Sequence, residues 1–156
     1  MNRGLTPIRL QAGSFMLEAL IAILIVALGI LGSVGLLARS LQETGDARNR
    51  AEAAALANGL ITDMWLTDRL TTTLQTEYDS NPGSGTGYTD FKALVASRLP
   101  NTAATPPVVV VQPGPIVPAN PALQTNSMVT ITITWQPPGD TVAHKYDVIA
   151  SIGANQ

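Results

Sequence analysis

An uncharged stretch of twenty residues, Ala19 to Ala38, constrains the fold of this chain more than any other feature. As an α-helix it would be roughly 30 Å long, which matches the hydrocarbon core of a bilayer. A buried core helix is the alternative, but little of the 156-residue chain remains to wrap a helix of this length. The stretch therefore predicts a membrane span.

The charges beside this stretch predict its orientation. Arg3, Arg9 and the amino terminus precede it, and no acidic residue occurs before Glu18. On the other side, acidic residues soon balance Arg39. Because positive charge stays in the cytoplasm, we expect residues 1–13 there and the rest of the chain across the inner membrane, in the periplasm.

A secretory signal or a plain anchor could also begin in this way. A cleaved signal has an apolar stretch of about 7 to 15 residues followed by a small-x-small cleavage site. Here the stretch is longer and runs into Leu36, Leu37, Ala38 and Arg39. An uncleaved anchor fits the length, but it gives no reason for the carboxylate of Glu18.

The residues from Gly13 to Glu18, GSFMLE, followed by the apolar ALIAIL, form a specific pattern. It resembles the processing site of type IV prepilins and type II secretion pseudopilins. The resemblance implies cleavage between Gly13 and Ser14 by prepilin peptidase and N-methylation of the new amino terminus. Glu18 would then be the fifth residue of the cleaved chain, counted from Ser14. Ser14 departs from the phenylalanine that most major pilins have there, which leaves the extent of methylation open.

Glu18 needs a partner whatever the family. A carboxylate in hydrocarbon costs about 2.5 to 3.5 kcal/mol on insertion scales, so such groups usually lie near a partner or an interface. Cleavage would supply one in the amine of Ser14, and an acid in the first helical turn is favoured by the helix dipole. The resemblance implies that Glu18 pairs with the amine of a neighbouring subunit during assembly; a glutamate resting at the headgroup level is the alternative.

The helical pattern continues beyond the span. Residues 39–70 contain no proline and are rich in good helix formers, and a helix from about Phe15 to about Leu70 is expected. Its predicted apolar stripe comprises Leu56, Leu60, Ile61, Met64 and Trp65. Four small residues in the membrane part suit close helix packing or local flexibility: Gly29, Gly32, Ser33 and Gly35. The expected divisions are a leader at 1–13, a transmembrane part at 14–38, an amphipathic part at 39–71 and a β-rich head at 72–156.

The head is expected to be a small antiparallel sheet packed on the second half of the long helix, an α+β layout. Residues 128–135 and 144–152 alternate apolar and polar side chains and predict a hairpin. Residues 108–111, VVVV, are flanked by prolines and predict an edge strand. The glycine-rich segment 76–90 predicts a flexible loop, and Asp90 is expected to cap a short helix. A type IV pilin-like fold with this layout is what the resemblance implies.

Composition excludes several functions. The chain has no cysteine and a net charge of −2 with mixed signs, so neither a disulfide nor a nucleic-acid surface is expected. His144 is the only histidine. Together with Asp140, Asp147 and one of several serines it could form a catalytic triad, but we expect it to be a surface residue. No enzyme activity, metal or cofactor is predicted, and Trp65, Trp135 and Tyr146 are interpreted as core residues.

Within the family, three segments resemble the PilV group of minor pilins, which act in assembly of a type IV pilus for twitching motility or adhesion. These segments begin at Leu17, at Ala51 and at Val129. The resemblance implies other minor and major pilins, the pilus assembly platform and inner-membrane lipid as partners. A type II secretion minor pseudopilin remains an alternative, as does a single-pass periplasmic binding or sensor protein with an uncleaved anchor.

Overall fold

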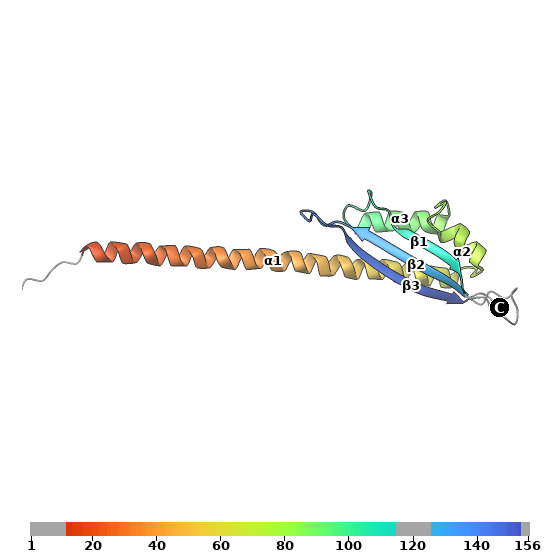
Figure 1. The fold of residues 1–156 in the computed structure, drawn as a ribbon, viewed down its shortest axis with the longest axis horizontal. Coiled ribbons are helices and arrows are strands. Elements are labelled where there is room, and N and C mark those ends of the chain that lie inside the picture. Colours follow the sequence, from red (N-terminus) through yellow and green to blue (C-terminus); the bar gives the residue numbers. More distant parts are fainter. Residues whose placement is uncertain (1–11, 115–125, 154–156) are drawn as a thin grey trace, which may run out of the picture. The chain divides into compact units, whose positions relative to one another are not determined.

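The computed structural model describes residues 12–114 and 126–153, without the side chains of residues 12–14 (Figure 1). Within these residues three helices precede three strands, which fits the expected α+β layout. The elements are α1 (Ala12–Leu66), α2 (Thr71–Tyr78), α3 (Thr86–Arg98), β1 (Val108–Pro113), β2 (Asn126–Trp135) and β3 (His144–Gly153). The chain divides into two compact units, Met1–Thr44 and Gly45–Gln156. From here on, the word head means this second unit. It contains the last part of α1 as well as the residues 72–156 that the sequence predicts for the head.

The described part of the first unit belongs to α1, and its surface is uncharged and largely apolar from Ala19 to Ala38. Every side chain from Phe15 to Thr44 is exposed. Among the described residues, α1 is the one helix long and apolar enough to cross a membrane. A continuous apolar surface of this size needs a non-aqueous or protein surrounding. The exposure of these side chains also argues against the alternative in which residues 19–38 form a buried core helix.

Helix α1 begins at Ala12, a little before the expected start, and ends at Leu66, before the expected Leu70. The early end has a local cause. Asp68 accepts hydrogen bonds from the Leu70 N–H (3.2 Å) and from the Thr73 hydroxyl (3.2 Å). This side-chain turn competes with helical hydrogen bonding and leads into α2.

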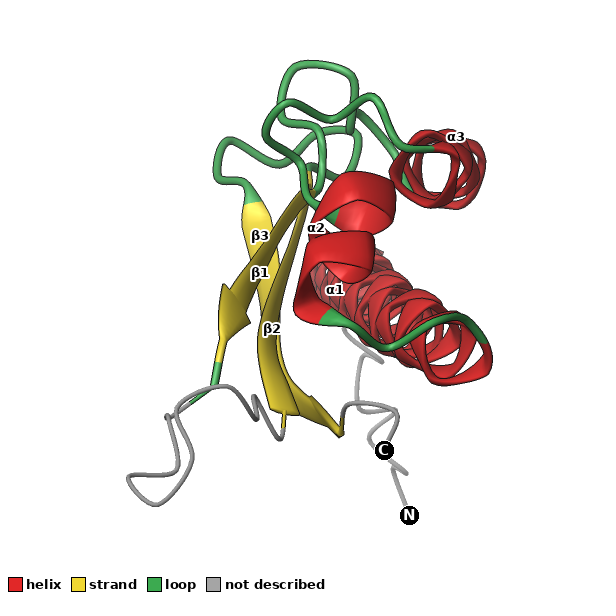
Figure 2. Cartoon of the chain, turned by 90° about the vertical axis from the view of Figure 1, so that its right-hand side faces the viewer, coloured by secondary structure: helices red, strands yellow, loops and turns green. Residues whose placement is uncertain are grey.

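The core of the head lies between one face of the sheet and the helices, as Figure 2 shows for the strand and helix layers. Leu56, Leu60 and Met64 of α1 are buried there, and Ile61 is partly buried against the same cluster. The expected stripe is therefore confirmed except at Trp65. Trp65 is 43% exposed, and the Arg69 guanidinium lies 5.2 Å from its ring centre, a cation–π contact.

The sheet has the order β1-β2-β3, and both pairs are antiparallel. The predicted hairpin and the predicted edge strand are both confirmed. In β2, Val129, Ile131, Ile133 and Trp135 are buried on one face, as the alternation indicates. The third expected core aromatic, Tyr146, is partly buried and packs against the cluster.

The outer edge of β1 is covered by α2 and the residues that follow it. Gln75 Nε2 donates to the Val111 carbonyl (2.9 Å), and the Val111 N–H donates to Asp79 Oδ2 (3.0 Å). Ser80 donates to the Val109 carbonyl through both its backbone N–H and its hydroxyl, each at 2.9 Å. Backbone groups that an edge strand would leave unpaired are thus satisfied within the head.

The glycine-rich segment 76–90 forms a loop only at residues 79–85, and both of its ends are helical, so the expected loop is confirmed in its middle part alone. Helix α2 runs to Tyr78 and α3 starts at Thr86 after a Gly85 cap, which places Asp90 inside α3 and not at its cap. Gly83 has a φ of +73°, a conformation that favours glycine. At Gly85, an added Cβ would meet the carbonyl oxygens of Thr76 and Glu77. These glycines permit close packing of α2 against α3.

Replacing Gly85 with alanine is expected to destabilise the head by about 1 to 3 kcal/mol, because the new methyl group must displace backbone. Gly59→Ala in α1 is the matched control, since nothing lies within 4 Å of an added Cβ there. That control is expected to be neutral or to stabilise by up to about 1 kcal/mol through helix propensity. Urea unfolding of the detergent-solubilised full chain, followed by tryptophan fluorescence, measures both. Equal stabilities would contradict the close packing at Gly85.

Candidate functional site

The first group of candidate residues lies at the start of α1. Gly13 and Ser14 have helical backbone, and Glu18 follows Ser14 by four residues, about one turn. The Glu18 side chain is exposed and has no hydrogen bond or ion pair to any described residue. Most of the expected leader, residues 1–11, lies outside the described residues.

Small residues in one part of α1 leave room for a neighbouring helix to approach its backbone. At Gly29, Gly32 and Gly35 nothing lies within 4 Å of an added Cβ. The helix is continuous through them, and the Ser33 hydroxyl donates to the Gly29 carbonyl at 2.9 Å. A second helix could therefore approach the backbone of α1 closely, as small residues allow in membranes.

The second group lies in the head, where β2 ends and β3 begins. His144 Nε2 and Asp140 Oδ2 are 2.7 Å apart, and both side chains are about one-third exposed. The expectation that His144 is a plain surface residue is therefore wrong. Its hydrogen bond to the Asp140 carboxylate lowers the pKa of Asp140, and the N–H of Val142 adds to the effect.

The imidazole of His144 also stacks on the buried indole of Trp135, with ring centroids 5.9 Å apart and planes at 21°. The indole Nε1 is buried and has no acceptor among the described residues. A buried N–H without an acceptor is unusual in a folded protein. Trp135 and His144 line one hollow of about 310 Å³, together with Asp46, Ala47, Arg50 and Lys145.

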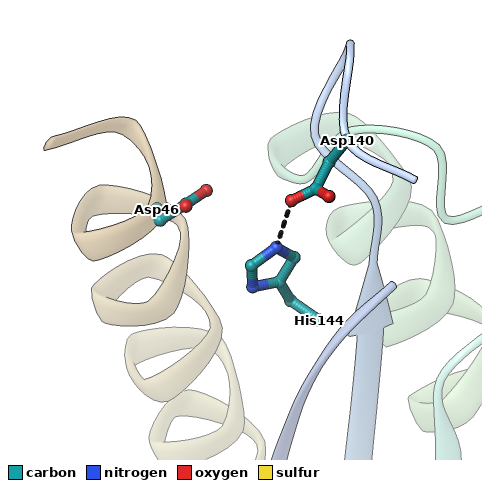
Figure 3. A group of neighbouring side chains, drawn as sticks. All are labelled: Asp46, Asp140 and His144. Carbon is teal, nitrogen blue, oxygen red and sulfur yellow. Dashed lines mark hydrogen bonds and ion pairs between the residues drawn. The ribbon is translucent and has the colours of Figure 1, made fainter. Parts of the chain in front are cut away.

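Asp46 lines this hollow from α1 and brings a second carboxylate near His144. Figure 3 shows its carboxylate pointing toward the His144–Asp140 pair. One side-chain donor atom from each of the three residues lies within 4.8 Å of the other two. Sequence reasoning singled out His144 and Asp140 but missed Asp46, because ninety-four residues separate Asp46 from Asp140 and only the fold brings them together.

Asp147 does not join this group, so it is not the acid of a possible catalytic triad with His144 and a serine. Residues three apart on a strand point to opposite faces. Asp147 instead accepts from Lys145 Nζ (2.9 Å) and from the Thr132 hydroxyl (2.7 Å). These two hydrogen bonds, the one from Lys145 first, lower the pKa of Asp147.

A scan of protein-family models finds no match to this chain, and searches of curated proteins and of solved structures find none either. Functional inference therefore depends on the chain's own residues. Two features stand out: a carboxylate without a partner among the described residues, on an exposed apolar helix, and a histidine with two carboxylates in the head.

Proposed function

We propose that this chain is a type IV pilin-like subunit, a minor pilin most like the PilV group, that acts in starting or assembling a pilus. The observation that carries the proposal is Glu18. It is a lone carboxylate without a partner among the described residues, five residues after Gly13 and at the head of an exposed apolar helix. A function in assembly gives this charge a partner.

In the proposed pathway, α1 anchors the precursor in the inner membrane with the head in the periplasm. Prepilin peptidase removes residues 1–13 and methylates the amine of Ser14. The assembly platform then extracts the subunit, and it packs by α1 against other minor and major pilins. Each step uses a feature of the N-terminal part of the sequence: a basic leader, a glycine before the cut, and an apolar stretch.

Two observations on α1 support packing between copies or between related subunits. Its exposed apolar surface in the first unit requires other apolar groups around it, from lipid or from neighbouring helices. Its glycines leave room for close contact. In such a bundle, Glu18 of one subunit meets the positive amine of the next, and this pair sets the axial register.

The processing step is tested by intact mass and N-terminal sequencing of the membrane protein from cells with and without prepilin peptidase. We expect a chain that starts at Ser14, methylated or not, only when the peptidase is present. Gly13→Val is expected to block the cut, whereas Gly4→Val in the same leader leaves it unchanged. A chain that starts at Met1 in both strains would refute the proposal and favour an anchored binding or sensor protein.

A second experiment distinguishes a pilus subunit from a type II secretion pseudopilin. It is needed because both classes of protein share the leader, the helix and the glutamate. Crosslinking in the membrane identifies which pilins contact α1 and the head. Deletion of the gene is expected to reduce twitching or surface pili. Loss of exoprotein secretion with normal pili would instead assign the chain to a type II secretion pseudopilus.

A further inference from the structure

We propose that Asp46, Asp140 and His144 form a binding site for a divalent first-row transition metal, with zinc as the representative ion. The site lies in the head, and its geometry does not depend on the function proposed above. It would join α1 to the connection between β2 and β3. The following observations support it.

The three donors match this class of ion. Two carboxylates and one imidazole are common zinc ligands, and three protein ligands leave a position for water. Donor atoms that share one ion at about 2.1 Å lie about 3 to 4 Å apart. The three donor atoms here already lie within 4.8 Å of one another, so a small side-chain movement would complete the set. A nitrogen donor disfavours calcium and magnesium, which prefer oxygen.

The charges around the hollow are also suitable. Two ionised carboxylates balance the charge of a divalent ion. Lys145 lines the hollow, but its ammonium is 2.9 Å from Asp147, and the Arg50 side chain is exposed. Asp46 makes no hydrogen bond or ion pair within the described part of the chain, so its carboxylate is available. Metal binding would displace any proton held between His144 and Asp140.

Trp135 provides an independent observation. It is 2% exposed, lines the same hollow, and its Nε1–H lacks an acceptor among the described residues. A buried donor without an acceptor is rare in native folds, and a bound water or ion nearby is one physical reason for it. Trp135 also stacks on His144, which orients the imidazole that would bind the ion.

The test uses the tag-free full chain in detergent, stripped with a chelator and titrated with Zn²⁺ by calorimetry. We expect one zinc per chain and a melting temperature that rises with zinc, since the ion binds the folded state. His144 is the only histidine and there is no cysteine, so competing nitrogen and sulfur sites on side chains are few. Calcium and magnesium are titrated in parallel.

Asp46→Asn is the decisive variant. It is expected to weaken zinc binding at least tenfold while leaving the melting temperature of the metal-free chain unchanged, because Asp46 has no partner among the described residues. His144→Gln is expected to weaken zinc binding similarly, although it also removes the contact with Trp135. Asp147→Asn, on the same strand as His144 but bonded to Lys145, is the control that retains binding.

A spectroscopic measurement places the ion. In a Trp65→Phe background Trp135 is the remaining tryptophan, and Co²⁺ should quench its fluorescence with saturation at one ion per chain. The Asp46→Asn variant should lose this saturable quenching. Equal zinc affinity in the wild type and Asp46→Asn, or no saturable binding, would overturn the proposal. Calcium or magnesium binding as tight as zinc would overturn the assigned class of ion.

Discussion

Replacing Ile131 with alanine is expected to lower the free energy of unfolding of the head by about 2 to 5 kcal/mol, as is typical for fully buried aliphatic residues. Ile131 is 0% exposed in the middle of β2, where it pairs with Val109 on one side and Val148 on the other. It belongs to the cluster that joins the sheet to α1. Its loss would leave a cavity that rigid neighbours on both sides cannot close.

Ile149→Ala is the matched control, because it removes the same atoms from the neighbouring strand at a position that is 63% exposed. We expect its effect to stay within about 0.5 kcal/mol. Urea unfolding of the full chain in detergent, with fluorescence and circular dichroism compared, measures both variants. Equal losses for Ile131 and Ile149 would show that the buried face of the sheet is assigned incorrectly.

The second large effect concerns assembly. Glu18→Ala is expected to leave membrane insertion intact, because it removes a carboxylate that costs about 2.5 to 3.5 kcal/mol in hydrocarbon. Under the proposed function, it also leaves the amine of a neighbouring subunit without its partner, a loss of about 3 to 5 kcal/mol for a buried pair. Since about 1.4 kcal/mol is a factor of ten, incorporation into pili should fall at least about a hundredfold.

Glu43→Ala is the control for Glu18→Ala, since Glu43 is also exposed on α1 but lies beyond the opposite end of the uncharged stretch, after Arg39. Glu18→Asp tests whether a negative charge at this position is enough for assembly when the side chain is shorter. Quantitative immunoblots compare each variant in membranes and in sheared pili. Normal incorporation of the Glu18→Ala variant into pili would contradict the role of Glu18 in assembly, on which the proposed function rests.

The hairpin and the helix stripe could be predicted from the sequence because their burial follows a simple period. In β2, Val129, Ile131 and Ile133 face the core at every second residue, as a strand with one buried face requires. In α1, Leu56, Leu60 and Met64 recur every four residues and are buried together. In both elements, the period of the apolar residues in the sequence matches the set of residues that the fold buries.

Other features depend on contacts that no local pattern encodes. Gly85 signals a loop by composition, yet its role is to admit the carbonyl oxygens of Thr76 and Glu77. Trp65 is apolar and lies at the end of the stripe, but α1 ends one residue later and leaves its ring exposed, against Arg69. Asp46 carries no signal by itself and becomes notable only beside His144.

The hydrogen bonds that α2 and Ser80 make to β1 have a consequence for how heads can associate. Within the described part of the chain, the Val109 carbonyl and both backbone groups of Val111 on the outer edge of β1 are already engaged, so β3 is the edge that could accept a foreign strand. Two heads could pair along β3, but their β1 edges would then resist a third copy. Sheet extension between heads is thus self-limiting, which protects the protein from amyloid-like growth.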